Sequence, residues 1–204
     1  MKSIATFIMI FVCFGLVFEH KKTMPATKRV NAFQKPTIPI KTGDVVFRSG
    51  KGFISDMFRK TSKNQQRFSH AGIAVVEHGN IFVYHMLGTP EKSQNALRKD
   101  KLADFCNSNE NIEYAVYRFQ ELNGKETRVN DYIKPLEIKK LIFDEHFDFK
   151  SDDAMYCTEF IYKILLASCD FKLSVSVLNG NEYVPLDNLY INNHSLKITE
   201  VSYQ

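Results

Sequence analysis

The feature that most constrains the fold is a pair of apolar segments joined by a short polar turn. Residues 69–76 and 81–87 are rich in β-branched and aromatic side chains, and the tetrapeptide Glu-His-Gly-Asn at residues 77–80 separates them. This pattern predicts a β-hairpin. Because both segments are apolar at successive positions, we expect two central strands that are covered on both faces.

The length of the turn decides which residues of this hairpin face one another. If residues 77–80 form a four-residue loop, Gly72 lies opposite His85, and His70 lies diagonal to His85 on the same side of the sheet. The glycine leaves room for an imidazole, and two neighbouring imidazoles suit a general base and its orienting partner. A loop one residue longer or shorter would put the histidines on opposite faces. A lone His70 would fit a hydrogen-bonded core histidine equally well.

A predicted helix over residues 153–167 carries the cysteine that suits these histidines. Cys157 shares an apolar face with four residues at helical spacing, namely Ala154, Ile161, Ile164 and Leu165. The Ser-Asp-Asp sequence at residues 151–153 supplies capping side chains. A helix start favours a thiolate, and its free N–H groups can hold an oxyanion. The alternative for Cys157 alone is a small core residue.

The remaining pattern mixes both kinds of element. We expect strands over residues 45–48 and 115–119, a helix with one buried face over residues 53–61, and a helix interrupted by Pro135 over residues 130–143. Residues 87–104 look like a polar loop, and loops with short strands follow Tyr183. Helices on an antiparallel sheet make this an α+β chain.

The N-terminus carries an apolar stretch at residues 4–18, which is too short for an ordinary membrane-spanning helix. Residues 1–20 are therefore expected to be a signal peptide, with an uncleaved N-terminal membrane anchor as the alternative. A polar flexible tether follows at residues 21–35, and the folded domain covers residues 36–204. Either reading implies an exported protein, whose membrane attachment would involve the N-terminus alone.

Composition argues against several other classes of protein. The 27 basic and 23 acidic residues are well mixed and contain no basic run, so nucleic acid is not an expected partner. No two of the four cysteines form a CxxC pair, and His70 and His85 lack a convincing third ligand, so no metal or other cofactor is expected. Cys106 and Cys169 are either a disulfide or two buried thiols.

Four short motifs in a fixed order resemble the YaeF/YiiX group of permuted papain-like amidases, which are relatives of the NlpC/P60 and lecithin:retinol acyltransferase folds. The motifs are Gly-Asp-Val-Val-Phe at residues 43–47, Ser-His-Ala-Gly-Ile at residues 69–73, Tyr-Cys-Thr-Glu-Phe at residues 156–160 behind an acidic run, and Pro-Leu-Asp-Asn-Leu at residues 185–189. The resemblance implies a circularly permuted papain-like (NlpC/P60-type) fold, in which an antiparallel sheet or half-barrel packs against helices.

The resemblance also implies roles for individual residues. Cys157 matches the family's nucleophile and His70 its general base, whereas His85 stands near the orienting third residue, often Glu in close relatives. Tyr156 and Asp44 are expected to contact the substrate.

The implied activity is that of a cysteine hydrolase that cleaves an amide, such as a cell-wall peptide bond, through a Cys157 thioester. The alternatives are a lipid acyl hydrolase or acyltransferase with the same fold, and a catalytically inactive binding module. The substrate is accordingly a small molecule, a peptide or a lipid.

Overall fold

The computed structural model describes residue 33 and residues 35–88, 95–147, 149, 151–178 and 180–203. The segments expected to be a signal peptide or anchor (1–20) and a tether (21–35) lie outside these residues, apart from residues 33 and 35. None of the helices in the described part of the chain has the length and apolar character needed to cross a membrane.

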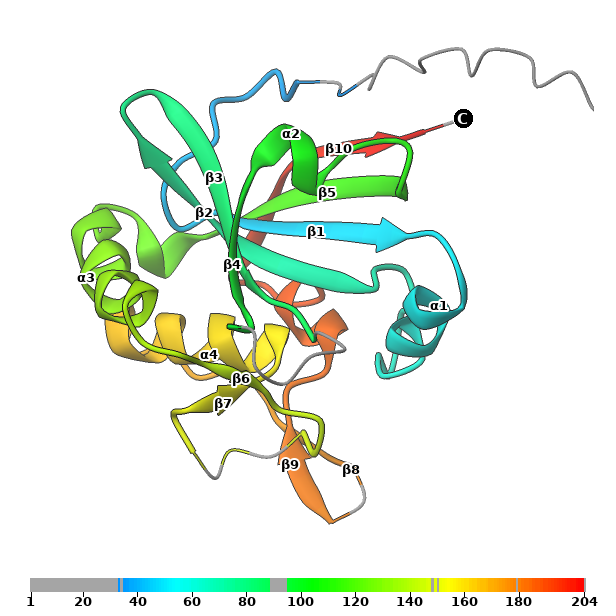
Figure 1. Cartoon of the computed structure of the whole chain (residues 1–204). Coiled ribbons are helices and arrows are strands. Elements are labelled where there is room, and N and C mark those ends of the chain that lie inside the picture. The colour runs from blue at the N-terminus through cyan, green and yellow to red at the C-terminus, as the bar shows by residue number, and fades with distance from the viewer. Residues whose placement is uncertain are drawn as a thin grey trace, which may run out of the picture. The chain divides into compact units, whose positions relative to one another are not determined.

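A six-stranded sheet, antiparallel throughout, organises the domain (Figure 1). In spatial order its strands are β10 (Ser195–Ser202), β5 (Asn111–Phe119), β1 (Val45–Gly50), β2 (His70–Glu77), β3 (Asn80–Met86) and β4 (Leu97–Lys101). Two short two-stranded sheets accompany it: β6 (Ile142–Phe143) with β7 (Ala154–Met155), and β8 (Ser176–Leu178) with β9 (Asn181–Tyr183).

Helices cover both faces of the large sheet. The helical segments are α1 (Phe53–Arg59), α2 (Leu102–Phe105), η1 (Gln120–Leu122), α3 (Glu126–Glu137), α4 (Cys157–Cys169) and η2 (Leu186–Leu189). The long helix α4 packs on β2 and β3 with α3 beside it, and α2 lies on the other face (Figure 1). The expected α+β architecture, an antiparallel sheet packed against helices, is confirmed.

Alternation along the central strands supplies a core on each side of the sheet. Val45 and Phe47 of β1 belong to the cluster that includes α4, whereas Val46 belongs to the cluster that includes Phe105 of α2. All three β1 side chains are fully buried. A strand covered in this way is apolar at successive positions, which is the pattern seen in the sequence.

The β2–β3 hairpin has the predicted register but a tighter turn. Val76 pairs with Ile81 as expected, and the pairing continues to Glu77 and Asn80. The turn therefore contains two residues, His78 and Gly79, both with positive φ (49° and 80°), as a type I′ turn requires. The expected four-residue loop is wrong, but the register is unchanged because shortening the loop only adds one pair.

Three other expectations are corrected. The helix begins at Cys157 rather than residue 153, because Ala154 and Met155 pair with β6 instead. The expected loop over residues 87–104 contains strand β4, whose polar sequence masks its pairing with β3. Helix α1 has no buried side chain, so the face expected to be buried is exposed, with Phe53 at 74%.

Candidate active site

The two histidines of the hairpin are hydrogen-bonded to each other. His70 begins β2 and His85 lies near the end of β3, and 2.8 Å separates His70 Nε2 from His85 Nδ1. Gly72 makes this possible, because a Cβ at that position would lie 2.9 Å from the Cβ of His85 and 2.8 Å from the Tyr84 carbonyl oxygen. The predicted proximity of the two imidazoles is confirmed.

Asp100 extends this pair into a chain of three side chains. It lies on β4 and pairs with Val83 of β3, the strand between β4 and β2. Its Oδ2 is 2.9 Å from His85 Nε2. His85 is fully buried, whereas Asp100 reaches solvent. Sequence patterns do not single out Asp100, because the Leu-Arg-Lys-Asp-Lys sequence of β4 has the composition of a loop. Only the pairing of β4 with β3, which puts Asp100 on the same face as His85, identifies this residue.

The order of these hydrogen bonds assigns a tautomer to each ring. The hydrogen bond from His85 lowers the pKa of Asp100, so this carboxylate is ionised and only accepts. His85 therefore donates from Nε2, which leaves its Nδ1 as an acceptor for the N–H of His70 Nε2. His70 Nδ1 is then unprotonated, as a general base requires.

Burial keeps both imidazoles neutral. It lowers the pKa of His70 well below 6.5, and the positive charge of Arg48 acts in the same direction. Burial also lowers the pKa of His85, although the hydrogen bond to Asp100 opposes the shift. Arg48 pairs with His70 across β1 and β2, which places its charge beside the rings.

Cys157 occupies the first position of helix α4. Tyr156 is the N-cap residue in extended conformation, and its backbone N–H donates to Glu159 Oε2 at 3.3 Å. This capping interaction fixes where the helix starts. The expected Ser-Asp-Asp cap at residues 151–153 is wrong, since β7 lies between those residues and the helix.

Burial decides the protonation state of the Cys157 thiol. It raises the pKa of Cys157 to about 11, against the opposing effect of the backbone N–H groups of Ala71, Thr158 and Cys157 itself. The helix start thus favours the thiolate as expected, but removal from water outweighs it. At neutral pH the resting site holds a neutral thiol and a neutral imidazole.

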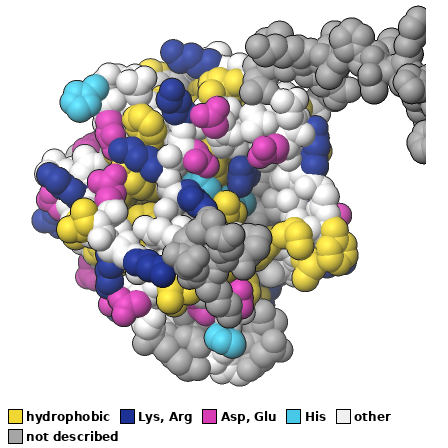
Figure 2. Space-filling view, in the orientation of Figure 1, with side chains coloured by type: hydrophobic (Ala, Val, Ile, Leu, Met, Phe, Trp, Pro, Cys, Tyr) yellow, Lys and Arg dark blue, Asp and Glu magenta, His cyan; other side chains and the backbone are white. Residues whose placement is uncertain are grey.

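Cys157 and His70 border adjoining cavities rather than touching. His70 lines an open pocket of about 300 Å³, and Cys157 lines a smaller cavity that shares part of its wall. Phe58 and Ser69 belong to both walls. No hydrogen bond joins the thiol to His70 within the residues that the structure describes; such contacts often tighten only when substrate binds. Figure 2 shows histidine atoms in a hollow between basic and acidic side chains.

The other two predicted site residues have different positions. Tyr156 borders the Cys157 cavity, but its hydroxyl already accepts the Val184 N–H at 3.0 Å. Asp44 is buried, accepts two 2.7 Å hydrogen bonds from Arg118, and borders neither cavity of the site. This ion pair anchors the start of β1, so the geometry supports a structural role for Asp44, and its contact with substrate stays a prediction.

Asp187, in the late motif at residues 185–189, holds the loop that leads to His70. Its buried carboxylate accepts the backbone N–H groups of Lys63, Asn64 and Gln65 at 3.2, 2.5 and 3.1 Å. Three donors on one carboxylate fix the approach to β2, so Asp187 helps to position His70.

The described residues offer no evident metal centre. They contain no group of three or more His, Cys, Asp or Glu side chains that could hold a metal ion. His85 uses both ring nitrogens in hydrogen bonds, which does not suit a ligand. Cys106 and Cys169 are free thiols, so their possible disulfide is not formed.

Comparison with known proteins matches residues 39–200 to the family described as permuted papain-like amidase enzyme, YaeF/YiiX, C92 family. Among solved structures, the metalloprotein YiiX from Escherichia coli O157:H7 is similar, with a TM-score of 0.65 and 15% sequence identity. The similarity covers 80% of this chain and 98% of that one, and it supports the same fold. No curated protein sequence gives a significant match.

Proposed function

Because the chain belongs to the YaeF/YiiX family of permuted papain-like amidases, a family of cysteine hydrolases, we propose that Cys157 is its nucleophile and that His70 is its general base. The observation that carries this proposal is the ordered chain from Asp100 through His85 to His70, which leaves His70 Nδ1 free to accept a proton.

The reaction is hydrolysis of an amide in two steps. His70 takes the proton of the Cys157 thiol as the sulfur attacks the carbonyl carbon, and the oxyanion is held by N–H groups at the start of α4. His70 then protonates the leaving amine, which departs and leaves a thioester. Water, deprotonated by His70, attacks that thioester and releases the acid and the thiol.

His85 and Asp100 act as positioning residues in this scheme. When His70 becomes an imidazolium, its Nε2–H still donates to His85. The negative charge of Asp100, on the far side of the His85 ring, stabilises the positive charge of His70. The neutral resting pair means that proton transfer accompanies attack rather than preceding it. Expulsion of water by the substrate strengthens each of these interactions.

The first test uses chromogenic acyl anilides that vary in acyl group, together with the intact mass of the protein. We expect one of them to be hydrolysed, with an acyl adduct on Cys157. Cys157→Ala should abolish the adduct and the hydrolysis, and His70→Ala should lower the rate by about a hundredfold or more.

Cys169→Ala is the matched control, because it removes a free thiol at the other end of the same helix. It should leave the hydrolysis unchanged. Full activity or an unchanged acyl adduct in Cys157→Ala would exclude the proposed nucleophile.

A second candidate, hydrolysis of a lipid acyl group by the same residues, is favoured by helix α1. Its side chains Phe53, Ile54 and Met57 are 74%, 63% and 51% exposed, and Ile54 also lines the pocket. An apolar surface at the mouth of a site suits a long acyl chain. The test compares how the rate depends on acyl length in Phe53→Ser and in the unaltered protein. If the rate rises with acyl length to the same extent in both, α1 does not bind the acyl chain.

A further inference from the structure

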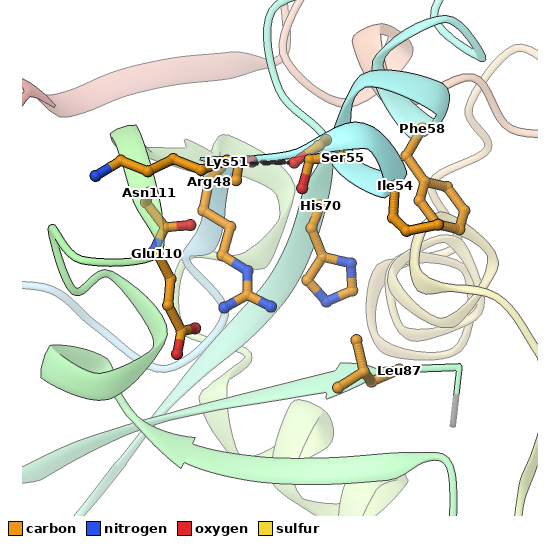
Figure 3. Close-up of a pocket in the computed structure, with 11 residues that line it drawn as sticks. Arg48, Lys51, Ile54, Ser55, Phe58, His70, Leu87, Glu110 and Asn111 are labelled. Carbon is orange, nitrogen blue, oxygen red and sulfur yellow. Dashed lines mark hydrogen bonds between the residues drawn. The ribbon is translucent and has the colours of Figure 1, made fainter. Parts of the chain in front are cut away.

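The pocket beside His70 has two chemically different walls. Figure 3 shows the Arg48 guanidinium and the His70 ring directed into the same space. Ile54, Phe58 and Leu87 supply apolar surface on one side, and the polar residues Lys51, Glu110 and Asn111 lie on the other (Figure 3). A ligand that fills this space meets a cation and an apolar wall at once.

Arg48 is held in place by uncharged groups. Its guanidinium carbon lies 4.4 Å from the centre of the Phe105 ring, and Nη1 donates to the Phe105 carbonyl oxygen at 3.3 Å. Stacking and a single hydrogen bond orient the planar group without using all of its donors. The Arg48 guanidinium is thus held in one orientation, and its other N–H groups are available to donate to a ligand.

Arg48 has no carboxylate partner within ion-pair distance among the residues described, in contrast to Arg118 and Arg67. Arg118 pairs with Asp44, and Arg67 pairs with Glu113. Glu110 borders the same pocket, but it is exposed and acts on Arg48 only at longer range. A half-buried guanidinium without an ion pair is costly to hold, unless an anion binds there at the time of function.

We propose that Arg48 recognises a carboxylate of the substrate, so that the amide cleaved by this site belongs to an anionic compound with an apolar group near the scissile bond. Guanidinium and carboxylate match in planar, bidentate geometry, which lysine does not provide. The apolar group packs on Ile54, Phe58 and Leu87. This assignment rests on the proposed function, because Cys157 must be the reacting group.

The test compares iodoacetate with iodoacetamide, which differ in one carboxylate and alkylate the thiol by the same displacement of iodide. Rates at Cys157 are divided by rates at Cys169, so the intrinsic difference between the reagents cancels. The iodoacetate preference of Cys157 should fall by about tenfold in Arg48→Gln, because a charge-assisted hydrogen-bonded pair is lost. Arg48→Lys should restore it only in part.

Lys197→Gln is the control for a change of charge, since Lys197 lies on β10, pairs with Glu200 and borders neither the pocket nor the Cys169 thiol. It should leave the preference unchanged. An equal preference in the unaltered protein and in folded Arg48→Gln would overturn the assignment. If Cys157→Ala hydrolyses the anilides as fast as the unaltered protein, the proposed function itself fails, whatever the alkylation rates show.

Protection of the unaltered protein supplies a readout that needs no substitution. Hexanoate should slow alkylation of Cys157 by iodoacetamide, whereas hexanamide, which has the same chain and no charge, should not. Equal protection by both compounds would show that the apolar wall alone binds them. That result, or no protection by either, contradicts carboxylate recognition even if Arg48→Gln fails to fold.

Discussion

At the scale of single residues, the site depends on hydrogen bonds that have a direction. Asp100 accepts from His85, His85 accepts from His70, and the remaining nitrogen of His70 is left to accept a proton. A reversal anywhere in this chain would put a proton on the atom that should be a base. The proposed chemistry therefore depends on a carboxylate that is two imidazoles away from the thiol.

The Asp100→Asn substitution tests this dependence. We expect the rate of hydrolysis to fall by about tenfold or more, because the amide removes the charge that stabilises the His70 imidazolium. Binding should be unaffected, so kcat falls while KM stays constant. Lys101→Gln on the same strand is the control for a change of charge, because Lys101 is exposed and pairs with Phe82 rather than with His85. An unchanged kcat in Asp100→Asn would mean that His85 needs no carboxylate.

Sequence patterns located the three reactive side chains but not their charged neighbours. Cys157, His70 and His85 stand out because each is rare and lies in an ordered motif or a hairpin register. Asp100 and Arg48 are ordinary charged residues in strands, and nothing local distinguishes them from solvated ones. Their importance follows from cross-strand pairing, with Arg48 opposite His70 and Asp100 one strand beyond β3.

At the scale of elements, the β2–β3 hairpin carries the site. Its two-residue turn sets the register, the register puts both histidines on one face, and Gly72 gives the His85 backbone room to approach. Helix α4 meets this hairpin and presents Cys157 at its first residue. The histidines face Phe105 of α2, whereas α4 packs on the other face of the hairpin, so Cys157 meets β2 at its first residues, where the Ala71 N–H donates to the thiol.

We expect Gly72→Ala to destabilise the fold and distort the site. The new Cβ would lie 2.5 Å from Val83 Cγ1 and 2.8 Å from the Tyr84 carbonyl oxygen, and the backbone oxygen cannot rotate away. The free energy of unfolding should fall by about 1–3 kcal/mol, measured by urea denaturation. Gly88→Ala is the control, because its Cβ would only touch the Phe143 ring at 3.4 Å. Equal stability of the two variants would contradict the close approach.

Errors in the element predictions have physical causes. Strand β4 is polar because it is an edge strand that pairs on one side only, so alternation of apolar residues is not required of it. Helix α1 has the spacing of a buried face, but spacing cannot tell a core from an apolar surface that meets a ligand. Central strands β1 and β2, apolar on both faces, were predicted well.

At the scale of the whole domain, the buried histidines make the fold sensitive to acid. The pKa values of His70 and His85 lie below the unfolded value of 6.5, so the unfolded chain binds more protons in this range. The two neutral rings make their full contribution to the free energy of unfolding above the unfolded pKa of 6.5. This contribution is lost as the pH falls towards the pKa values of the folded state. The expected direction is therefore a loss of stability on acidification.

Urea denaturation between about pH 7.5 and about pH 5 measures this loss. The free energy of unfolding should decline in the unaltered protein and decline less steeply in His70→Gln, which lacks one of the two groups. Ordinary carboxylates titrate alike in both proteins, so the difference between the slopes isolates His70. Parallel slopes would show that the pKa of His70 is not lowered by folding.

The overall architecture was accessible from sequence because its determinants are redundant. Several apolar strands, a long helix and four ordered motifs each support the same permuted papain-like fold, so single errors at α1 or β4 do not change it. The pocket beside His70 has no such redundancy. It is assembled from a few residues of β1, α1, the start of β2 and the loop before β5, and only their positions in space bring them together.

The tight turn at His78 and Gly79 has a consequence for how such sequences diverge. Surface turns are where homologous chains ordinarily gain and lose residues. Here an added residue is harmless only if the loop absorbs it, because a shift of the pairing by one residue would carry His85 to the other face of the sheet and separate it from His70. We therefore expect lineages that retain the activity to keep Gly72 opposite His85, even where the turn between the two strands changes length. In this family the pairing of two strands should be inherited as strictly as a nucleophile.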